Sequence, residues 1–149
     1  MQVKFKKLSK YASIPYQQHK HDAGYDVTAA EAAVVPAGKW TLVKTGLAVQ
    51  LPDDMELQVR SRSGLALKKG VFCLNAPGTV DAGYRNEIGV ILANLGNEDF
   101  HIEIGDRVAQ FIFQHPKHPG ISEVSDINES DRGLGGFGST GINHKSKEK

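Results

Sequence analysis

Met55-Glu56-Leu57-Gln58-Val59-Arg60 is the stretch that decides the fold class. Apolar and polar residues alternate in it with a period of two, which is the pattern of a half-buried β-strand, because successive side chains of a strand point to opposite faces. Further short apolar runs lie on both sides of it, bounded by Gly, Pro, Asn or Asp, which favour turns. We therefore expect strands at residues 39–43, 46–51, 71–74, 88–95, 102–104 and 108–113.

Helical patterns are scarce in the sequence. Only Ser63–Lys69 could form a short helical turn, and no segment carries a sustained apolar stripe at helical spacing. Many short strands joined by polar turns indicate a sandwich or a jelly roll, so we expect an all-β fold. The length of 149 residues suits one such domain.

Composition narrows the classes of partner and compartment. The formal net charge of +1 argues against strong nonspecific binding of nucleic acid. No apolar run approaches the ~18 residues that span a bilayer, and the polar start does not resemble a signal peptide, so no membrane partner is expected. The single cysteine, Cys73, excludes an internal disulfide and agrees with a reducing cytoplasm. We expect Cys73 to be a small buried apolar residue.

The segment from Asn128 to Lys149 differs from the rest of the chain. It is rich in Gly, Ser, Asp, Asn and Lys, which is typical of a disordered tail. Residues 132–141 nevertheless place one arginine and one aromatic ring among glycines, which let backbone amides approach a ligand, and among hydroxyls suited to phosphate. We therefore expect a β domain at residues 1–127 and a flexible arm at 128–149 that orders over an anion carrying a flat ring.

The glycines at 133–138 also satisfy the dinucleotide-binding pattern G-x-G-x-x-G. That pattern requires a strand before it, a helix after it and a βαβ unit of ~30 residues, whereas only residues 139–149 follow here. A P-loop is excluded as well, because no lysine precedes Ser139 or Thr140.

Three further clusters carry groups that suit phosphate chemistry. Residues 23–27 form a turn that enters a strand, with Asp26 just after the turn. Residues 60–65 offer arginine side chains, serine hydroxyls and backbone amides to an anion. Residues 105–110 form a turn that ends in Gln110, a neutral donor. Each also has an ordinary structural interpretation, since Asp favours turns and charged runs are commonly solvated edges.

Residues 75–85 are the most informative cluster. Two short strands flanking Pro77-Gly78 are expected to form a hairpin, whose backbone groups could read the edge of a nucleobase or serve structure alone. Asp81 and Tyr84, three residues apart, pair a candidate general base with an aromatic platform.

Taken in order, these clusters resemble the motifs of the homotrimeric dUTP pyrophosphatases (dUTPases) across nearly the whole chain. Two positions depart from the family pattern: Ser61 stands where the second motif commonly has Pro, and Leu134 occupies a usually polar position. We expect Ser61 to loosen the turn that presents Arg62. The matching segments are residues 23–26, 62–66, 78–85, 105–110 and 132–141.

The resemblance implies a jelly-roll (β-clip) subunit and a homotrimer with active sites at its interfaces. It also implies that the protein hydrolyses dUTP to dUMP and pyrophosphate, which lowers dUTP and supplies dUMP for dTTP synthesis. Asp81 would activate the water that attacks the α-phosphorus. Tyr84 would pack beneath the deoxyribose and reject a 2′-hydroxyl, while Asn75 and the backbone around Gly78 would read the uracil edge.

The remaining roles concern phosphates and metal. The resemblance implies that Mg²⁺ is held mainly by the substrate phosphates and supported through water by Asp26. Arg132 would reach the terminal phosphate while Phe137 closes over the uracil ring. The other substrate-binding residues implied are Arg62, Ser63, Gly64, Gln110, Gly138 and Ser139.

Two alternative functions remain open. The first is that of the related dCTP deaminases, which carry a catalytic glutamate at the position where this chain has Ile91, a residue that cannot shuttle protons. The second is a trimeric nucleotide sensor whose dUTP-bound arm recruits a regulatory protein partner, since order–disorder changes of a tail are a known switching device.

Overall fold

A computed structural model describes residues 2–139, 141 and 142. The chain divides into two compact units, Met1–Lys117 and His118–Lys149. The second unit begins before residue 128, where the sequence analysis placed the start of the arm. Thr140 and residues 143–149 of the expected arm lie outside the described residues.

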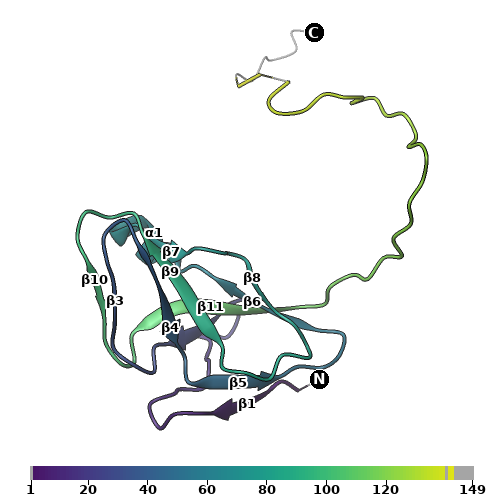
Figure 1. Cartoon of the computed structure of the whole chain (residues 1–149). Coiled ribbons are helices and arrows are strands. Elements are labelled where there is room, and N and C mark those ends of the chain that lie inside the picture. Colours follow the sequence, from purple (N-terminus) through teal and green to yellow (C-terminus); the bar gives the residue numbers. More distant parts are fainter. Residues whose placement is uncertain (1, 140, 143–149) are drawn as a thin grey trace. The chain divides into compact units, whose positions relative to one another are not determined.

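The first unit contains short strands and one short helix (Figure 1). The all-β prediction is therefore confirmed. In chain order, the elements are β1 (Lys4–Lys7), β2 (Tyr25–Thr28), β3 (Ala33–Val35), β4 (Trp40–Lys44), β5 (Leu47–Gln50), β6 (Glu56–Arg60), α1 (Ser63–Lys69), β7 (Val71–Cys73), β8 (Gly78–Val80), β9 (Gly89–Asn94), β10 (Phe100–Ile102) and β11 (Arg107–Gln114).

The strands form small antiparallel sheets. The largest has the order β2-β11-β6-β8, a second has the order β4-β9-β7, and β1-β5 and β3-β10 form two pairs. Figure 1 shows β1 beside β5 at one end of the unit and β3 beside β10 at another. The inward faces share one apolar core, whose largest fully buried side chains include Phe111, Leu47, Leu57, Ile88, Leu92 and Ile102.

The alternation in β6 has the predicted consequence. Leu57 and Val59 are buried at 0% and 6% exposure, while Arg60 on the opposite face is exposed. The short helix α1 also lies where the sequence predicted it. It ends at Gly70, which has a left-handed φ of 66° and donates its backbone N–H to the carbonyl oxygens of the last turn.

Two local predictions were wrong. The expected strand at 102–104 is instead β10 at Phe100–Ile102, because Glu103 begins a turn in which its N–H donates to Asp106 Oδ2 at 2.9 Å. The strands flanking Pro77-Gly78 do not pair as a hairpin either. β7 pairs with β9 and β8 pairs with β6, so the two strands belong to different sheets. The turn residues at Pro77-Gly78 indicated that the chain reverses there, but they carry no information on which strands β7 and β8 pair with.

Cys73 is buried, as predicted. Burial raises the pKa of its thiol, and a hydrogen bond with the Ser61 side chain offsets part of that effect. None of the helices among the described residues has the length and apolar character required to cross a membrane.

Candidate active site

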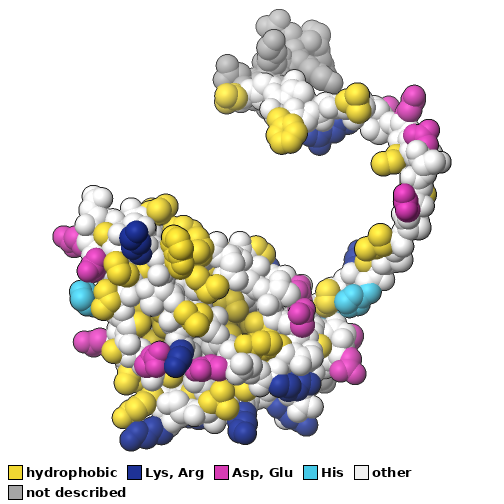
Figure 2. Space-filling view, viewed as in Figure 1, with side chains coloured by type: hydrophobic (Ala, Val, Ile, Leu, Met, Phe, Trp, Pro, Cys, Tyr) yellow, Lys and Arg dark blue, Asp and Glu magenta, His cyan; other side chains and the backbone are white. Residues whose placement is uncertain are grey.

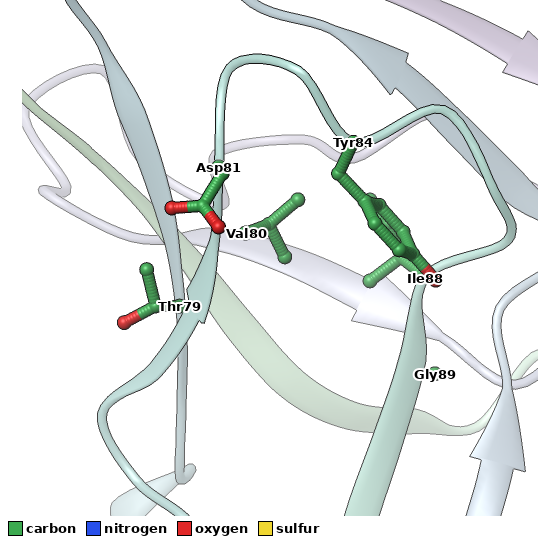
Figure 3. A pocket seen from close by; sticks show the side chains of 6 residues that line it. All are labelled: Thr79, Val80, Asp81, Tyr84, Ile88 and Gly89. Atoms are coloured by element: carbon green, nitrogen blue, oxygen red, sulfur yellow. The ribbon is translucent and has the colours of Figure 1, made fainter.

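An open pocket of about 230 Å³ lies where β8, the following loop and the start of β9 meet. It is lined by Thr79, Val80, Asp81, Tyr84, Ile88 and Gly89. Figure 3 shows Thr79 and Asp81 on one side of this pocket and Tyr84 on the other. Because β8 and β9 belong to different sheets, their ends are not joined by a strand ladder, and the loop between them leaves this hollow.

Backbone and side-chain bonds fix the two chemical groups of the pocket. The Tyr84 N–H donates to the Asp81 carbonyl oxygen at 3.0 Å, which closes a tight turn. The Tyr84 hydroxyl donates to the Glu87 carbonyl oxygen at 2.8 Å, so the ring is held against the far side of the loop. The Asp81 side chain is exposed, and no ion pair within the described part of the chain engages it.

Asn75 and Gly78 lie together just before the pocket. Gly78 is buried on β8, and a side-chain carbon added there would lie 3.2 Å from Asn75 Nδ2 and 3.4 Å from Val59 Cβ. Glycine is the residue that fits this close approach. The two residues predicted to read a base therefore lie close together, although neither lines the pocket itself.

A second polar cluster lies at the start of β2. The Asp26 carboxylate, whose side chain is 15% exposed, accepts from Arg62 Nε at 3.2 Å and from Arg107 Nη1 at 3.1 Å. Arg62 also donates to the Arg107 carbonyl oxygen at 3.3 Å. One carboxylate thus orients two arginines, whose remaining N–H groups can bind an anion. The sequence analysis missed Arg107, although it is the third residue of the segment 105–110.

Gln110 joins this cluster from the neighbouring strand. It lies directly opposite Asp26 on β2 and Arg60 on β6 in the strand register, and its Nε2 donates to the Ser61 carbonyl oxygen at 2.9 Å. A side-chain carbon on Gly24 would overlap the Gln110 amide oxygen, which explains the glycine in that turn. The first, second and fourth predicted motifs therefore meet at one place.

Ser63 and Gly64 follow Arg62 in the chain and begin α1. Both residues are exposed, and they directly follow Arg62, a member of the Asp26 cluster, in the chain. No side chain caps the start of the helix. A side-chain carbon on Gly64 would meet nothing within 4 Å, so the backbone there is open to approach.

The strand register separates the two clusters within one copy of the chain. Asp26 lies on β2 and Asp81 just after β8, at opposite edges of the four-stranded sheet. Arg60, Gln110 and Asp26 form one row across the sheet. Because Val59 pairs with Gly78, this row passes one residue before Gly78, and Asp81 lies four residues further along the direction of β8. Strand spacings of about 4.8 Å and a rise of about 3.3 Å per residue put the two carboxylates roughly 20 Å apart.

The arm residues are described within their own unit. Arg132 Nε donates to the Gly135 carbonyl oxygen at 2.9 Å, and Arg132, Phe137, Gly138 and Ser139 are all exposed. Phe137 has a φ of 47°, which is uncommon for a residue other than glycine.

In the part of the chain that the structure describes, the protein's own side chains do not enclose a metal ion. Among the described residues, no group of three or more His, Cys, Asp and Glu side chains is placed to hold one. Both oxygens of Asp26 already accept arginine N–H groups. This donor set fits Mg²⁺ held by phosphate oxygens and waters, since Mg²⁺ keeps several waters and takes few protein ligands in nucleotide sites.

Solved structures confirm the fold class. The dUTPase of Staphylococcus bacteriophage 80alpha with dUpNHpp is 29% identical, with a TM-score of 0.87 over 95% of this chain and 99% of that chain. A mutant dUTPase from phage phi11 of S. aureus, 24% identical with a TM-score of 0.79 over 87% of this chain and 100% of that chain, is described as coordinating a structural Mg(II) ion. The predicted dUTPase-like jelly roll is therefore correct.

Sequence comparisons extend this likeness to the family. The profile of the dUTPase family matches residues 10–141. The deoxyuridine 5'-triphosphate nucleotidohydrolase of Clostridium tetani is 48% identical over 139 residues, which cover 93% of this chain and 96% of the relative. The protein of that name from Rickettsia felis is 49% identical over 144 residues, covering 95% and 97%. This chain belongs to the dUTPase family.

Proposed function

We propose that Asp81 is the general base with which this chain hydrolyses dUTP to dUMP and pyrophosphate. The activity is that of its family, whose members carry the name deoxyuridine 5'-triphosphate nucleotidohydrolase. The observation that supports Asp81 is its exposed carboxylate at the edge of a pocket that also carries a fixed aromatic ring. A carboxylate whose oxygens are not engaged by an arginine or a lysine can take a water molecule within hydrogen-bond reach, as a general base must.

The reaction needs one proton transfer and one displacement. Asp81 takes a proton from a water whose oxygen attacks the α-phosphorus of dUTP, and the bond from that phosphorus to the leaving pyrophosphate breaks in line. A positioned base of this kind contributes about 10²–10⁴-fold to the rate.

The pocket beside Asp81 suits the nucleoside. A volume of about 230 Å³ between β8 and the Tyr84 ring is narrow, and Tyr84 is held by its own hydroxyl. The ring therefore packs beneath the deoxyribose and leaves no room for a 2′-hydroxyl. Asn75 and the backbone at Gly78, which lie close together, read the uracil edge, and the tight loop excludes a 5-methyl group.

The phosphates are bound by the Asp26 cluster of another copy of the chain. Phosphate groups of one nucleotide lie only a few ångströms apart, whereas roughly 20 Å separates Asp81 from Asp26 within one copy. One copy therefore supplies Asp81 and Tyr84, and a neighbour supplies the phosphate-binding groups. Those groups are Arg62, Ser63, Gly64 and Gln110.

An exposed apolar face supports assembly into the homotrimer. Trp40 and Leu42 on β4 are 64% and 57% exposed, and their cross-strand partners on β9 are Ala93 and Ile91. Figure 2 shows hydrophobic side chains gathered over this part of the first unit. Contiguous apolar surface of this kind is typical of protein–protein contacts.

Magnesium and the arm complete the proposed site. Mg²⁺, bound to the phosphates with Asp26 supporting it through water, would offset part of the roughly four negative charges of dUTP. Arg132 binds the terminal phosphate, and Phe137 stacks on uracil, which is worth about 1–3 kcal/mol. Gly138 and Ser139 bring backbone and hydroxyl groups to the phosphates. A reducing cytoplasm is the proposed compartment, because the only cysteine is a buried thiol.

The alternatives from the sequence analysis are not favoured. Ile91 occupies the position of the deaminase glutamate and cannot shuttle protons; it lines a depression together with Leu42, Lys44 and Glu87. A pure nucleotide sensor would not require the exposed Asp81 carboxylate beside the pocket.

Asp81→Asn tests the general base. We expect kcat for dUTP to fall by about 10²–10⁴-fold, because the amide cannot take the proton, while a nonhydrolysable dUTP analogue binds with unchanged affinity. Pyrophosphate release and calorimetry measure the two effects. Asp53→Asn, in an exposed turn, is the matched control and keeps full activity. An unchanged kcat in Asp81→Asn would remove Asp81 as the base.

Asp26→Asn tests the arginine cluster. The amide presents its oxygen to one arginine and an NH2 donor to the other, so one of the two contacts is lost; we expect kcat/KM for dUTP to fall about tenfold and stability to fall by about 1–3 kcal/mol. Steady-state kinetics and denaturant unfolding provide the measurements. Glu31→Gln breaks the exposed pair with Lys44 at 3.8 Å and should change neither. Wild-type kcat/KM in Asp26→Asn would contradict the proposed role of the cluster.

A chain that ends at Asp131 tests the arm. We expect the same oligomeric state and thermal stability as the full chain, because no strand of the first unit is removed, but little dUTP hydrolysis. A chain that ends at Ile142 retains the glycine-rich motif and serves as the control. Light scattering and pyrophosphate release are the measurements. Hydrolysis at the full rate by the shorter chain would show that the arm takes no part.

A further inference from the structure

Ser61 connects three strands at the point where the chain leaves β6. Its Oγ accepts from the Cys73 backbone N–H on β7 at 2.9 Å. Its carbonyl oxygen accepts from Gln110 Nε2 on β11 at 2.9 Å. The residue is therefore held from both sides, once through its side chain and once through its backbone. The sequence analysis expected the opposite, a looser turn at this position.

The Ser61 hydroxyl provides a hydrogen-bond acceptor for the buried backbone N–H of Cys73. Cys73 is 2% exposed and its strand pairs with β9 on one side, so the Cys73 N–H depends on the Ser61 oxygen as its acceptor on the other. A buried N–H without an acceptor is unfavourable, and the chain near it shifts to find one. The bond consequently constrains the backbone of Ser61 more firmly than an exposed hydroxyl bond would.

The next residue in the chain is Arg62, whose guanidinium is oriented by Asp26 at 3.2 Å and by the Arg107 carbonyl oxygen at 3.3 Å. Both partners of Arg62 lie on β2 and β11, whereas the hydrogen bond from Cys73 links Ser61 to β7, a strand of another sheet. The position from which the Arg62 side chain starts is thus set by the two bonds of Ser61. A shift at Ser61 would reach Arg62 directly.

We propose that Ser61 is a positioning residue for phosphate binding, and that its hydroxyl acts through Arg62. The inference rests on the proposed function, because it assigns the phosphates to Arg62. The family pattern commonly has proline at this position. Proline restricts φ but offers no hydroxyl to the Cys73 N–H, so the proposed role of Ser61 distinguishes this chain from that pattern.

A double-mutant cycle with a nonhydrolysable dUTP analogue tests the proposal. Ser61→Ala removes the hydroxyl and Ser61→Thr keeps it; each is combined with Arg62→Ala, and the Kd is measured by calorimetry in the presence of Mg²⁺. We expect Ser61→Ala to raise Kd about fivefold in the wild-type background and Ser61→Thr to stay within about twofold of wild type. In the Arg62→Ala background, Ser61→Ala should add nothing further.

Two further variants serve as a substitute and as a control. Ser61→Pro also lacks the hydroxyl and should match Ser61→Ala in Kd, so it replaces that variant if alanine prevents folding. Thr41→Ala removes another hydroxyl bond, from Thr41 Oγ1 to the Val34 carbonyl oxygen at 2.8 Å, and should leave Kd unchanged. Hydrogen exchange at the Cys73 amide should accelerate in the alanine and proline variants and not in Ser61→Thr.

The outcomes separate this inference from the proposed function. Hydrolysis of dUTP by the wild-type chain decides the function independently. A wild-type Kd in both Ser61→Ala and Ser61→Pro overturns the role of Ser61. So does an effect of equal size in the Arg62→Ala background, since that result would show a general structural effect and not one transmitted through Arg62.

Discussion

The register of the four-stranded sheet β2-β11-β6-β8 is the constraint on which the site depends. Pairing of Asp26 with Gln110, and of Gln110 with Arg60, brings the start of β2 and the end of β6 into a single row with the middle of β11. A slip of one residue in any of these pairs would turn the polar side chains toward the core. The apolar alternation of Leu57 and Val59, with 0% and 6% exposure, resists such a slip. Core packing therefore places the polar groups.

The two clusters differ in their electrostatics, and the difference matches their proposed roles. The Asp26 carboxylate holds two arginines, so the phosphate-binding groups are oriented before an anion arrives. The Asp81 carboxylate has no such partner among the described residues, so its oxygens are open to a water molecule. Roughly 20 Å separates the two clusters within one copy, so in the proposed site they meet only when two copies assemble.

The sequence was sufficient wherever the determinant was local. The period of two at residues 55–60 predicted β6, and the residues 63–69 were identified as the one candidate helix. Prediction failed where the determinant was a distant partner. Nothing near Pro77-Gly78 indicates that β7 pairs with β9 and β8 with β6, and it is this separation that creates the pocket beside Asp81.

The candidate site shows the same division. Arg62 and Gln110 could be selected from their motifs, but the contact between Asp26 and Arg107 joins residues 81 positions apart. Ser61 illustrates the limit most clearly, because its identity suggested a looser turn until its partner, the Cys73 amide, was known.

The most direct test of the central claim is complementation between two inactive variants. Asp81→Asn and Arg62→Ala subunits are mixed, unfolded and refolded together, and dUTP hydrolysis is compared with that of each variant refolded alone. If Asp81 and Arg62 of one site come from different copies, an equal mixture regains about a quarter of the wild-type sites, one site in each mixed trimer. A mixture no more active than its components, from subunits shown to exchange, would contradict the account.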